Sequence, residues 1–299
     1  MSKVWLVTGS SRGLGRNIAT AALEAGHRVF ATARKPEQLD DLVQKYGDRI
    51  RAYALDVTNA EAARAAVRIA VDTFGKLDVV VNNAGYGNMG SIEDVREDDF
   101  RAQFETNFFG VVNVTRAALP VLRAQRSGHI IQISSIGGRM GTPGLGAYQS
   151  AKWAVEGFSE VLNTEVMPLG IKVTIVEPGG FRTDWAGSSM SIDEVREDYR
   201  PSVGRVIERV RNGATVPVGD PAKAAKVILE IAGMDSPPFR ILLGSDAVHF
   251  AGLMATKRAE EDAKWKSLSL TTDAEPPEQG KLDALVDALR GNGARANGG

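Results

Sequence analysis

Two side chains that together can move a proton stand four residues apart near the middle of the chain: Tyr148 and Lys152. They lie in a stretch, 147–168, whose apolar residues recur at helical spacing. Residues four apart share one face of a helix, so the phenol and the amine can converge on one point. A phenol has a pKa of about 10 and is a poor base at neutral pH, but a nearby ammonium stabilises the phenolate and lowers that pKa. The pair predicts a tyrosine that exchanges a proton with a substrate oxygen, although the same spacing also describes a packed ring beside a solvated amine.

A glycine-rich turn follows the first apolar run of the chain and leads into a helical pattern. It reads Thr8-Gly9-Ser10-Ser11-Arg12-Gly13-Leu14-Gly15. Glycine lets the backbone approach a pyrophosphate closely, and the N–H groups at a helix start favour an anion. The spacing G-x-x-x-G-x-G differs from the general fingerprint, and by itself it also suits a tight strand-to-helix corner. In the context of the Tyr148 and Lys152 pair, we interpret the turn as a dinucleotide site that uses Gly9, Ser11, Gly13, Leu14 and Gly15.

The charges after the second apolar run indicate which dinucleotide binds. An NAD site usually places Asp or Glu about 20 residues after the glycines, where it bonds to the ribose hydroxyls. Here the chain reads Val29-Phe30-Ala31-Thr32-Ala33-Arg34-Lys35, and the first carboxylate is Glu37. Arg34 and Arg12 are suited to the 2′-phosphate of NADP, unless both are simply solvated surface charges. The sequence therefore predicts NADP(H) as the cofactor.

Seven short apolar runs alternate with helical segments along the chain. The expected strands are 4–7, 29–32, 50–55, 77–81, 129–133, 171–176 and 240–243. The expected helices are 13–26, 36–46, 59–74, 96–125, 147–168 and 221–233. Apolar strands joined by helical crossovers predict an α/β protein of the Rossmann type, a doubly wound, seven-stranded parallel sheet with helices on both faces.

Two regions depart from this alternation. Residues 181–220 form a long excursion at the end of a strand, with an amphipathic stretch near 191–212, and we interpret them as a lid over the substrate. Residues 245–268 are expected to be helical, whereas 271–299 is rich in Pro, Gly and Asn. We therefore expect one catalytic domain over 1–270 and a C-terminal extension over 271–299 that is partly disordered.

Composition excludes several classes of function. The 36 basic and 37 acidic residues give a net charge of −1, so there is no broad field for nucleic acid or an anionic membrane, and the expected partner is a small molecule. The chain has no cysteine and only three scattered histidines, so we expect neither thiolate chemistry nor a metal site. The first apolar run is too short for a signal peptide and none reaches the roughly 18 residues that span a bilayer, which favours a cytoplasmic protein.

Taken together, these motifs resemble those of the short-chain dehydrogenases/reductases, in the family's order and spacing. The matching positions are Thr8 to Gly15, Asp56-Val57, Asn82-Asn83-Ala84-Gly85, Asn107, Ser135, Tyr148, Lys152 and Pro178-Gly179. The resemblance covers roughly residues 3–245. It implies a single-domain oxidoreductase and offers no counterpart for the last part of the chain.

The resemblance also implies a role for each catalytic position. Tyr148 would be the general acid/base, and Ser135 would hydrogen-bond the substrate carbonyl or hydroxyl. Lys152 would bind the nicotinamide ribose and lower the Tyr148 pKa, and Asn107 would hold a water that links Lys152 to solvent, unless it is a structural amide. Ser134 competes with Ser135, because adjacent side chains of a strand point to opposite faces and only one can line the site.

Further cofactor contacts are implied in the same way. Asp56 would accept from the adenine amino group with Val57 beside the ring, and Asn83, Ala84 and Gly85 would form the wall near the adenosine ribose. Pro178 and Gly179 would let the backbone pass close to the nicotinamide, and Thr183 would reach its carboxamide or the diphosphate.

The resulting interpretation is an NADP(H)-dependent enzyme that moves a hydride between nicotinamide and a secondary alcohol or ketone. An epimerase, dehydratase or enoyl reductase on the same scaffold usually alters the Ser/Tyr/Lys set, which is intact here. The alternative from another class is a non-catalytic NADP(H)-sensing protein. Met89, Met140, Leu145, Trp185 and Met190 lie in the segments expected to form the substrate pocket and suggest an apolar site. The family resemblance further implies a homodimer or homotetramer.

Overall fold

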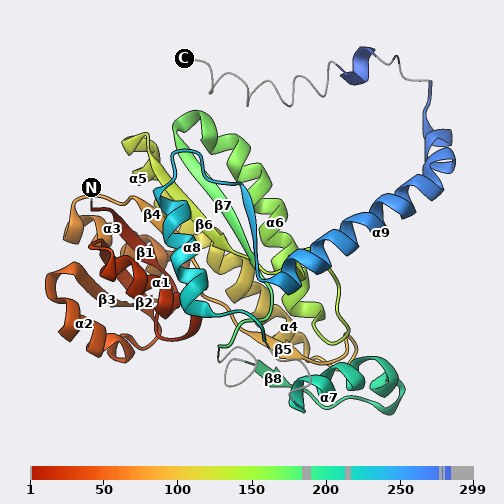
Figure 1. The fold of residues 1–299 in the computed structure, drawn as a ribbon, viewed down its shortest axis with the longest axis horizontal. Helices are drawn as coiled ribbons and strands as arrows, with labels where there is room; N and C mark the ends of the chain where they lie inside the picture. Colours follow the sequence, from red (N-terminus) through yellow and green to blue (C-terminus); the bar gives the residue numbers. More distant parts are fainter. Residues whose placement is uncertain (1, 184–189, 213–216, 276–277, 279, 284–299) are drawn as a thin grey trace.

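A seven-stranded parallel sheet forms the centre of the protein (Figure 1). The computed structural model describes residues 2–183, 190–212, 217–275, 278 and 280–283. The strand order is β3-β2-β1-β4-β6-β7-β9, and every neighbouring pair is parallel. The strands are β1 Val4–Val7, β2 Arg28–Ala33, β3 Ile50–Ala54, β4 Val79–Asn82, β6 Gly128–Ile133, β7 Ile171–Pro178 and β9 Arg240–Leu243. The predicted fold class is confirmed, and each predicted strand differs by at most a few residues at its ends.

Helices cover both faces of the sheet because its strands are apolar on both sides. The covering helices are α1 Gly13–Glu24, α2 Asp40–Tyr46, α3 Ala60–Phe74, α5 Gly110–Gln125, α6 Gly146–Val166 and α8 Pro221–Gly233. Along β1, Trp5 and Val7 join the core under α1 and α8, whereas Val4 and Leu6 join the core under α3, α5 and α6. Alternate residues of one strand thus contribute to two separate cores, and burial of both stabilises the sheet that carries the site.

The long helix expected over 96–125 is interrupted in its first half. It consists of α4 Glu97–Phe104, a π-helical turn Glu105–Phe109, and α5. A π turn inside a helix adds one residue and is often found at functional sites. Here it holds Asn107, which is fully buried.

The expected lid contains a short strand that the periodicity did not indicate. β8 Met190–Ile192 pairs in parallel with β5 Gly87–Met89, a strand also absent from the sequence-based assignment. The amphipathic stretch near 191–212 is not one helix, because only α7 Arg205–Arg211 within it is α-helical. Three-residue strands carry too little periodicity to be recognised from the sequence. Residues 184–189, with Trp185, and 213–216 lie outside the described part of the lid.

The last long helix, α9 Ser245–Ser269, extends away from the body of the protein (Figure 1). Only Ala247 and Ala251 of this helix are buried. Among the described residues, no helix is both long and apolar enough to cross a bilayer. The segment expected to be disordered falls largely on 284–299, outside the described residues. The remaining short elements are 3-10 turns at Pro36–Leu39, Gly47–Arg49, Ile136–Gly138, Met167–Leu169, Glu197–Tyr199 and Leu270–Thr272, and a π turn at Arg200–Gly204.

Candidate active site

The glycine turn lies at the point where the strand order reverses, between β1 and β4. In an open α/β sheet the loops after two such strands diverge and leave a crevice for a ligand. The two loops are joined here by hydrogen bonds: the Thr8 hydroxyl accepts from the backbone N–H groups of Asn83 (3.0 Å) and Ala84 (3.1 Å). The Asn83 amide donates to the carbonyl oxygens of Thr8 (2.9 Å) and Gly9 (3.1 Å). The predicted cofactor positions after β1 and after β4 are therefore neighbours in space.

Glycine is required in this turn for two distinct reasons. Gly9 and Gly13 have φ of 66° and 56°, a region that other residues rarely adopt. At Gly15 a methyl group would lie 2.3 Å from the Asn83 amide nitrogen and 2.4 Å from the Gly9 carbonyl oxygen. The turn can therefore close against Asn83 only without a side chain at Gly15. A Cβ at Gly13 would be 3.7 Å from Thr183, which places the start of α1 beside the beginning of the lid.

The remaining predicted cofactor residues line the same edge of the sheet. Arg12 and Arg34 are both exposed; Arg12 directly precedes α1, and Arg34 directly follows β2. Asp56, exposed after β3, accepts from the Thr58 N–H (3.0 Å) and hydroxyl (2.8 Å). Val57 is buried against Gly110, where a methyl group would come within 2.5 Å of the valine side chain. The glycine turn, the two arginines, and Asp56 with Val57 are compatible with a dinucleotide that carries an extra phosphate.

Pro178 and Gly179 end β7 near the N-terminus of α9. The Gly179 N–H donates to the Leu243 carbonyl (2.9 Å), and the Gly180 N–H donates to the Asp246 carboxylate (2.7 Å). A methyl group at Gly179 would lie 2.2 Å from the same carboxylate, so the close approach of the chain to α9 excludes a side chain there.

The structure brings Ser135, Tyr148 and Lys152 together. Ser135 follows β6, and Tyr148 and Lys152 lie on α6, where they are 8% and 4% exposed. The Ser135 hydroxyl is hydrogen-bonded to the Tyr148 phenol and also accepts from the Gly137 N–H (3.0 Å). The Lys152 Nζ lies 5.7 Å from the centre of the Tyr148 ring and donates to the Ile133 carbonyl (2.8 Å).

Ser134, the alternative to Ser135, is buried, and its hydroxyl has no hydrogen-bond partner among the described residues. A Cβ at Gly138 would be 2.8 Å from this hydroxyl and 3.0 Å from the Glu156 side chain. Of the two serines, Ser135 is the one that contacts Tyr148.

Burial controls the charge state of the phenol and the amine in the protein alone. It raises the pKa of Tyr148 to about 12, against a smaller lowering by the Ser135 hydrogen bond. It lowers the pKa of Lys152 to about 8, against the opposing charge of Glu156. Loss of solvation therefore determines the Tyr148 pKa in the protein alone, and the predicted lowering of this pKa beside a bound nicotinamide stays a prediction. A neutral phenol is suited to donate a proton.

Asn107 lies beside Lys152 across Gly85. A methyl group at Gly85 would be 2.5 Å from the Asn107 amide oxygen and 3.8 Å from Lys152 Nζ. The Asn107 amide accepts from the Tyr86 N–H (3.2 Å) and donates to the Tyr86 carbonyl (2.9 Å). Asn107 therefore fixes the backbone that follows Gly85 and also lies within reach of the Lys152 environment, so both predicted roles stay open.

Comparison with known proteins identifies the family. The family model for short chain dehydrogenase matches residues 3–193. The chain belongs to the short-chain dehydrogenase family. It is 54% identical to the oxidoreductase BOA17 of Botryotinia fuckeliana, over 91% of this chain and all of that protein. It is 41% identical to the 3-ketodihydrosphingosine reductase of Bacteroides thetaiotaomicron, over 81% of this chain and 88% of that protein.

Solved structures agree with this identification. A short-chain dehydrogenase from Streptomyces avermitilis superimposes with a TM-score of 0.86 at 42% identity, covering 91% of this chain and all of the other. A short-chain dehydrogenase from Burkholderia cenocepacia, in complex with NADP, gives 0.70 at 27% identity over 88% and 97%. This short-chain dehydrogenase is thus an oxidoreductase with a Rossmann-type fold.

The apolar residues predicted for the substrate pocket of this short-chain dehydrogenase gather between β5 and the lid. Met89 is buried with Val203 and Ile207, and Leu145 and Met190 pack against them. Met140 is not part of this cluster, and Trp185 lies outside the described residues.

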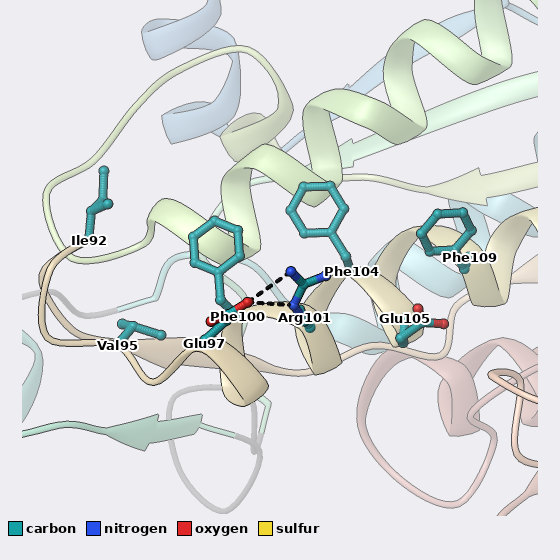
Figure 2. Close-up of a pocket in the computed structure, with 8 residues that line it drawn as sticks. All are labelled: Ile92, Val95, Glu97, Phe100, Arg101, Phe104, Glu105 and Phe109. Carbon is teal, nitrogen blue, oxygen red and sulfur yellow. Dashed lines mark hydrogen bonds and ion pairs between the residues drawn. The ribbon is translucent and has the colours of Figure 1, made fainter.

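A groove of about 580 Å³ lies elsewhere, along α4 and the π turn (Figure 2). It is lined by Ile92, Val95, Glu97, Phe100, Arg101, Phe104, Glu105 and Phe109, with Arg101 paired to Glu97. None of the predicted site residues of this short-chain dehydrogenase lines it, so we do not assign it to the reaction.

Sequence reasoning missed the buried polar residues that support the candidate active site. Gln103 and Asn88 are buried beside Asn107, and Arg139 pairs with the fully buried Glu177 at 2.8 Å. Gln103 lies one helical turn before Asn107, a spacing that predicts contact. The other partners are distant in sequence, and no local pattern indicates them.

Proposed function

We propose that this short-chain dehydrogenase is an NADP(H)-dependent carbonyl reductase acting on ketones, with the reverse oxidation of a secondary alcohol available to the same site. The observation that carries the proposal is the contact of Ser135 with Tyr148, with Lys152 beside the ring, at the end of the sheet where the glycine turn opens. A hydroxyl, a phenol and an amine converge where a substrate oxygen would develop negative charge.

The chain's own residues handle the substrate oxygen and the proton. The Ser135 hydroxyl donates a hydrogen bond to the carbonyl oxygen and polarises it. The Tyr148 phenol gives its proton to that oxygen as it becomes an alcohol, and the buried Lys152 stabilises the phenolate that is left. NADPH, when bound, supplies the hydride that reduces the carbonyl carbon. Asn107 then holds a water that links Lys152 to solvent, and a proton that passes along this path restores the phenol.

NADP(H) is proposed over NAD(H) on charge. Arg34 and Arg12 stand at the cofactor edge, and no carboxylate follows β2 before Glu37. Their guanidinium groups would bond to the 2′-phosphate, and Gly9, Gly13 and Gly15 would hold the pyrophosphate. The Burkholderia structure with NADP supports this assignment.

The substrate is proposed to be an apolar ketone. The cluster formed by Met89, Leu145, Met190, Val203 and Ile207 would contact its chain or ring. The name of the Bacteroides relative, a reductase of the ketone 3-ketodihydrosphingosine, supports both the direction and the apolar character.

The test is a screen of ketones of graded size with NADPH, run beside NADH, for the wild type and Tyr148→Phe. The wild type is expected to oxidise NADPH with at least one apolar ketone. Tyr148→Phe should bind NADPH normally and lose at least about 100-fold in kcat. Full activity of Tyr148→Phe would refute the mechanism. Tight NADP(H) binding with no turnover of any ketone or alcohol would favour the sensing protein instead.

A further inference from the structure

A chain of buried amide groups runs from Asn107 to the lid. Asn107 Nδ2 donates to the Gln103 side-chain oxygen at 3.0 Å. Gln103 Nε2 donates to the Asn88 side-chain oxygen at 3.0 Å. Gln103 is fully buried and Asn88 is 3% exposed, so both amides depend on protein partners rather than on water.

The partners of the Gln103 side chain differ between the two orientations of its amide. With nitrogen and oxygen exchanged, the nitrogen donates to the Tyr86 carbonyl (3.0 Å) and the oxygen accepts from the Asn88 N–H (2.8 Å). In this orientation Gln103 bonds to the backbone of Tyr86 and Asn88 in place of the Asn107 and Asn88 side chains. In either orientation Gln103 is bonded to Asn88, and the Gln103 backbone carbonyl accepts from Asn107 Nδ2 at 3.0 Å.

The far end of the chain is attached to the lid strand. Asn88 Nδ2 donates to the Asp193 carboxylate at 3.3 Å, and the Asp193 N–H donates to the Met89 carbonyl at 2.8 Å. Asp193 directly follows β8, whose Ser191 is opposite Asn88 in the parallel pairing with β5. Asn88 is thus bonded to Gln103 on one side and to the lid on the other.

A second set of contacts holds the same lid segment without reaching Asn107. Arg196 pairs with Asp94 at 2.8 Å and with Glu93, and the Tyr199 hydroxyl donates to Glu93 at 2.8 Å. Arg196 and Glu93 are exposed, so their ion pair stabilises the lid little. Two sets of contacts therefore hold the same lid segment. Of the two, the contact of Asp193 with the buried Asn88 leads to Asn107, so the Arg196 contacts can serve as a control.

We propose that Gln103, Asn88 and Asp193 are positioning residues that couple the docking of the lid strand β8 to the placement of Asn107. When β8 pairs with β5, Asp193 fixes the Asn88 side chain, and Asn88 is bonded to the Gln103 side chain through its own side chain or its N–H. The Gln103 carbonyl in turn accepts from the Asn107 amide, which is bonded to the backbone that follows Gly85. The pairing of β8 with β5 then sets the residue beside Lys152 in its working position. The coupling to turnover depends on the carbonyl reductase function proposed above, whereas the coupling of lid to core does not.

The first arm of the test measures the lid directly, in the full-length protein. Gln103→Met keeps the side-chain volume but removes both hydrogen bonds of the amide. Gln103 itself does not touch the lid. Amide hydrogen exchange of the segment 190–193 is expected to become at least about tenfold faster in Gln103→Met. Arg196→Ala is the matched control and should leave the exchange of 86–89 unchanged. Unchanged exchange at 190–193 in Gln103→Met would overturn the proposal, whether or not any ketone is reduced.

The second arm measures kcat with NADPH and a ketone that the wild type reduces. Gln103→Met and Asp193→Ala should each lower kcat by about five- to twentyfold, and the double variant should be no slower than the slower single variant. Arg196→Ala should change kcat by less than about twofold. Losses that multiply in the double variant would show two independent effects and overturn the coupling. If Gln103→Met does not fold, Asn88→Ser interrupts the same chain from the β5 side and takes its place in both arms.

Discussion

The Lys152 ammonium donates a 2.8 Å hydrogen bond to the carbonyl oxygen of Ile133, two residues before Ser135. This bond joins α6, which carries the phenol, to the end of β6, which carries the serine hydroxyl. Lys152 therefore fixes the distance between the two elements whose side chains meet at the substrate oxygen. Because the Lys152 amine is buried, its charge loses hydration when the protein folds, and this loss lowers the stability of the wild type.

Replacing this lysine should stabilise the protein while it inactivates the enzyme. Burial lowers the Lys152 pKa to about 8, so the unfolded chain binds this proton more tightly than the folded one. Between pH 8 and the unfolded pKa of about 10.5 the unfolding free energy should rise with pH, as the buried charge is lost. Lys152→Met should raise the unfolding free energy at pH 7 by about 1–3 kcal/mol and remove that rise. Denaturant unfolding at pH 7, 8 and 9.5 measures both effects, and a less stable variant would contradict the argument.

His129 should account for part of the loss of stability in acid. Burial lowers its pKa to about 3, and its ring nitrogen Nε2 bonds to the Thr174 hydroxyl at 2.8 Å. The unfolded histidine takes up a proton near pH 6.5, so stability should fall as the pH decreases from 6.5, by about 1.4 kcal/mol for each pH unit. His129→Gln should flatten this slope between pH 6.5 and 4.5. The exposed His249→Gln is the matched control, and equal slopes in the two variants would exclude the assignment.

Arg34 should discriminate between the two dinucleotides. It is exposed immediately after β2, at the cofactor edge, and one charge-assisted hydrogen bond to a phosphate contributes about 1.5–3 kcal/mol. Arg34→Ala should therefore raise KM for NADPH about 10- to 100-fold and change KM for NADH by less than about threefold. Lys35→Ala, one residue further along, should have little effect on either. Equal increases for both cofactors would mean that Arg34 does not bind the 2′-phosphate.

The sheet could be predicted from the sequence because each buried parallel strand is a short apolar run that ends in a turn. Val4–Val7 is apolar at every position, and the side chain of Asn59 caps α3 by accepting from the Ala62 N–H. The covering of both faces follows from the same alternation. These features depend on residues that are close together in the sequence, so local patterns predict them.

The parts that could not be predicted depend on contacts between distant segments. The two-stranded sheet of β5 and β8 joins residues about 100 positions apart, and the buried Glu177 pairs with Arg139, before α6, and with Arg240, the first residue of β9. The π turn at Glu105–Phe109 has no sequence signal that separates it from an ordinary helix. The burial that raises the Tyr148 pKa in the protein alone is likewise a property of the folded state and not of the spacing of tyrosine and lysine.

Gly85 should tolerate no side chain, because its missing Cβ leaves room for the two groups on either side of it. A methyl group there would lie 2.5 Å from the Asn107 amide oxygen and 3.8 Å from Lys152 Nζ, so Gly85→Ala must displace the asparagine from the Tyr86 backbone. We expect kcat to fall about 10- to 100-fold and the unfolding free energy to fall by about 1–3 kcal/mol.

Gly157→Ala is the matched control, on the exposed side of α6 with no atom within 4 Å of the added methyl group. It should raise the unfolding free energy by about 0.5–1 kcal/mol, because alanine loses less conformational freedom than glycine in a helix, and it should leave kcat unchanged. Steady-state kinetics and denaturant unfolding of both variants give the comparison. If Gly85→Ala kept wild-type kcat, displacement of the Asn107 amide would not affect catalysis. The placement of Asn107 beside Lys152 would then have no part in turnover.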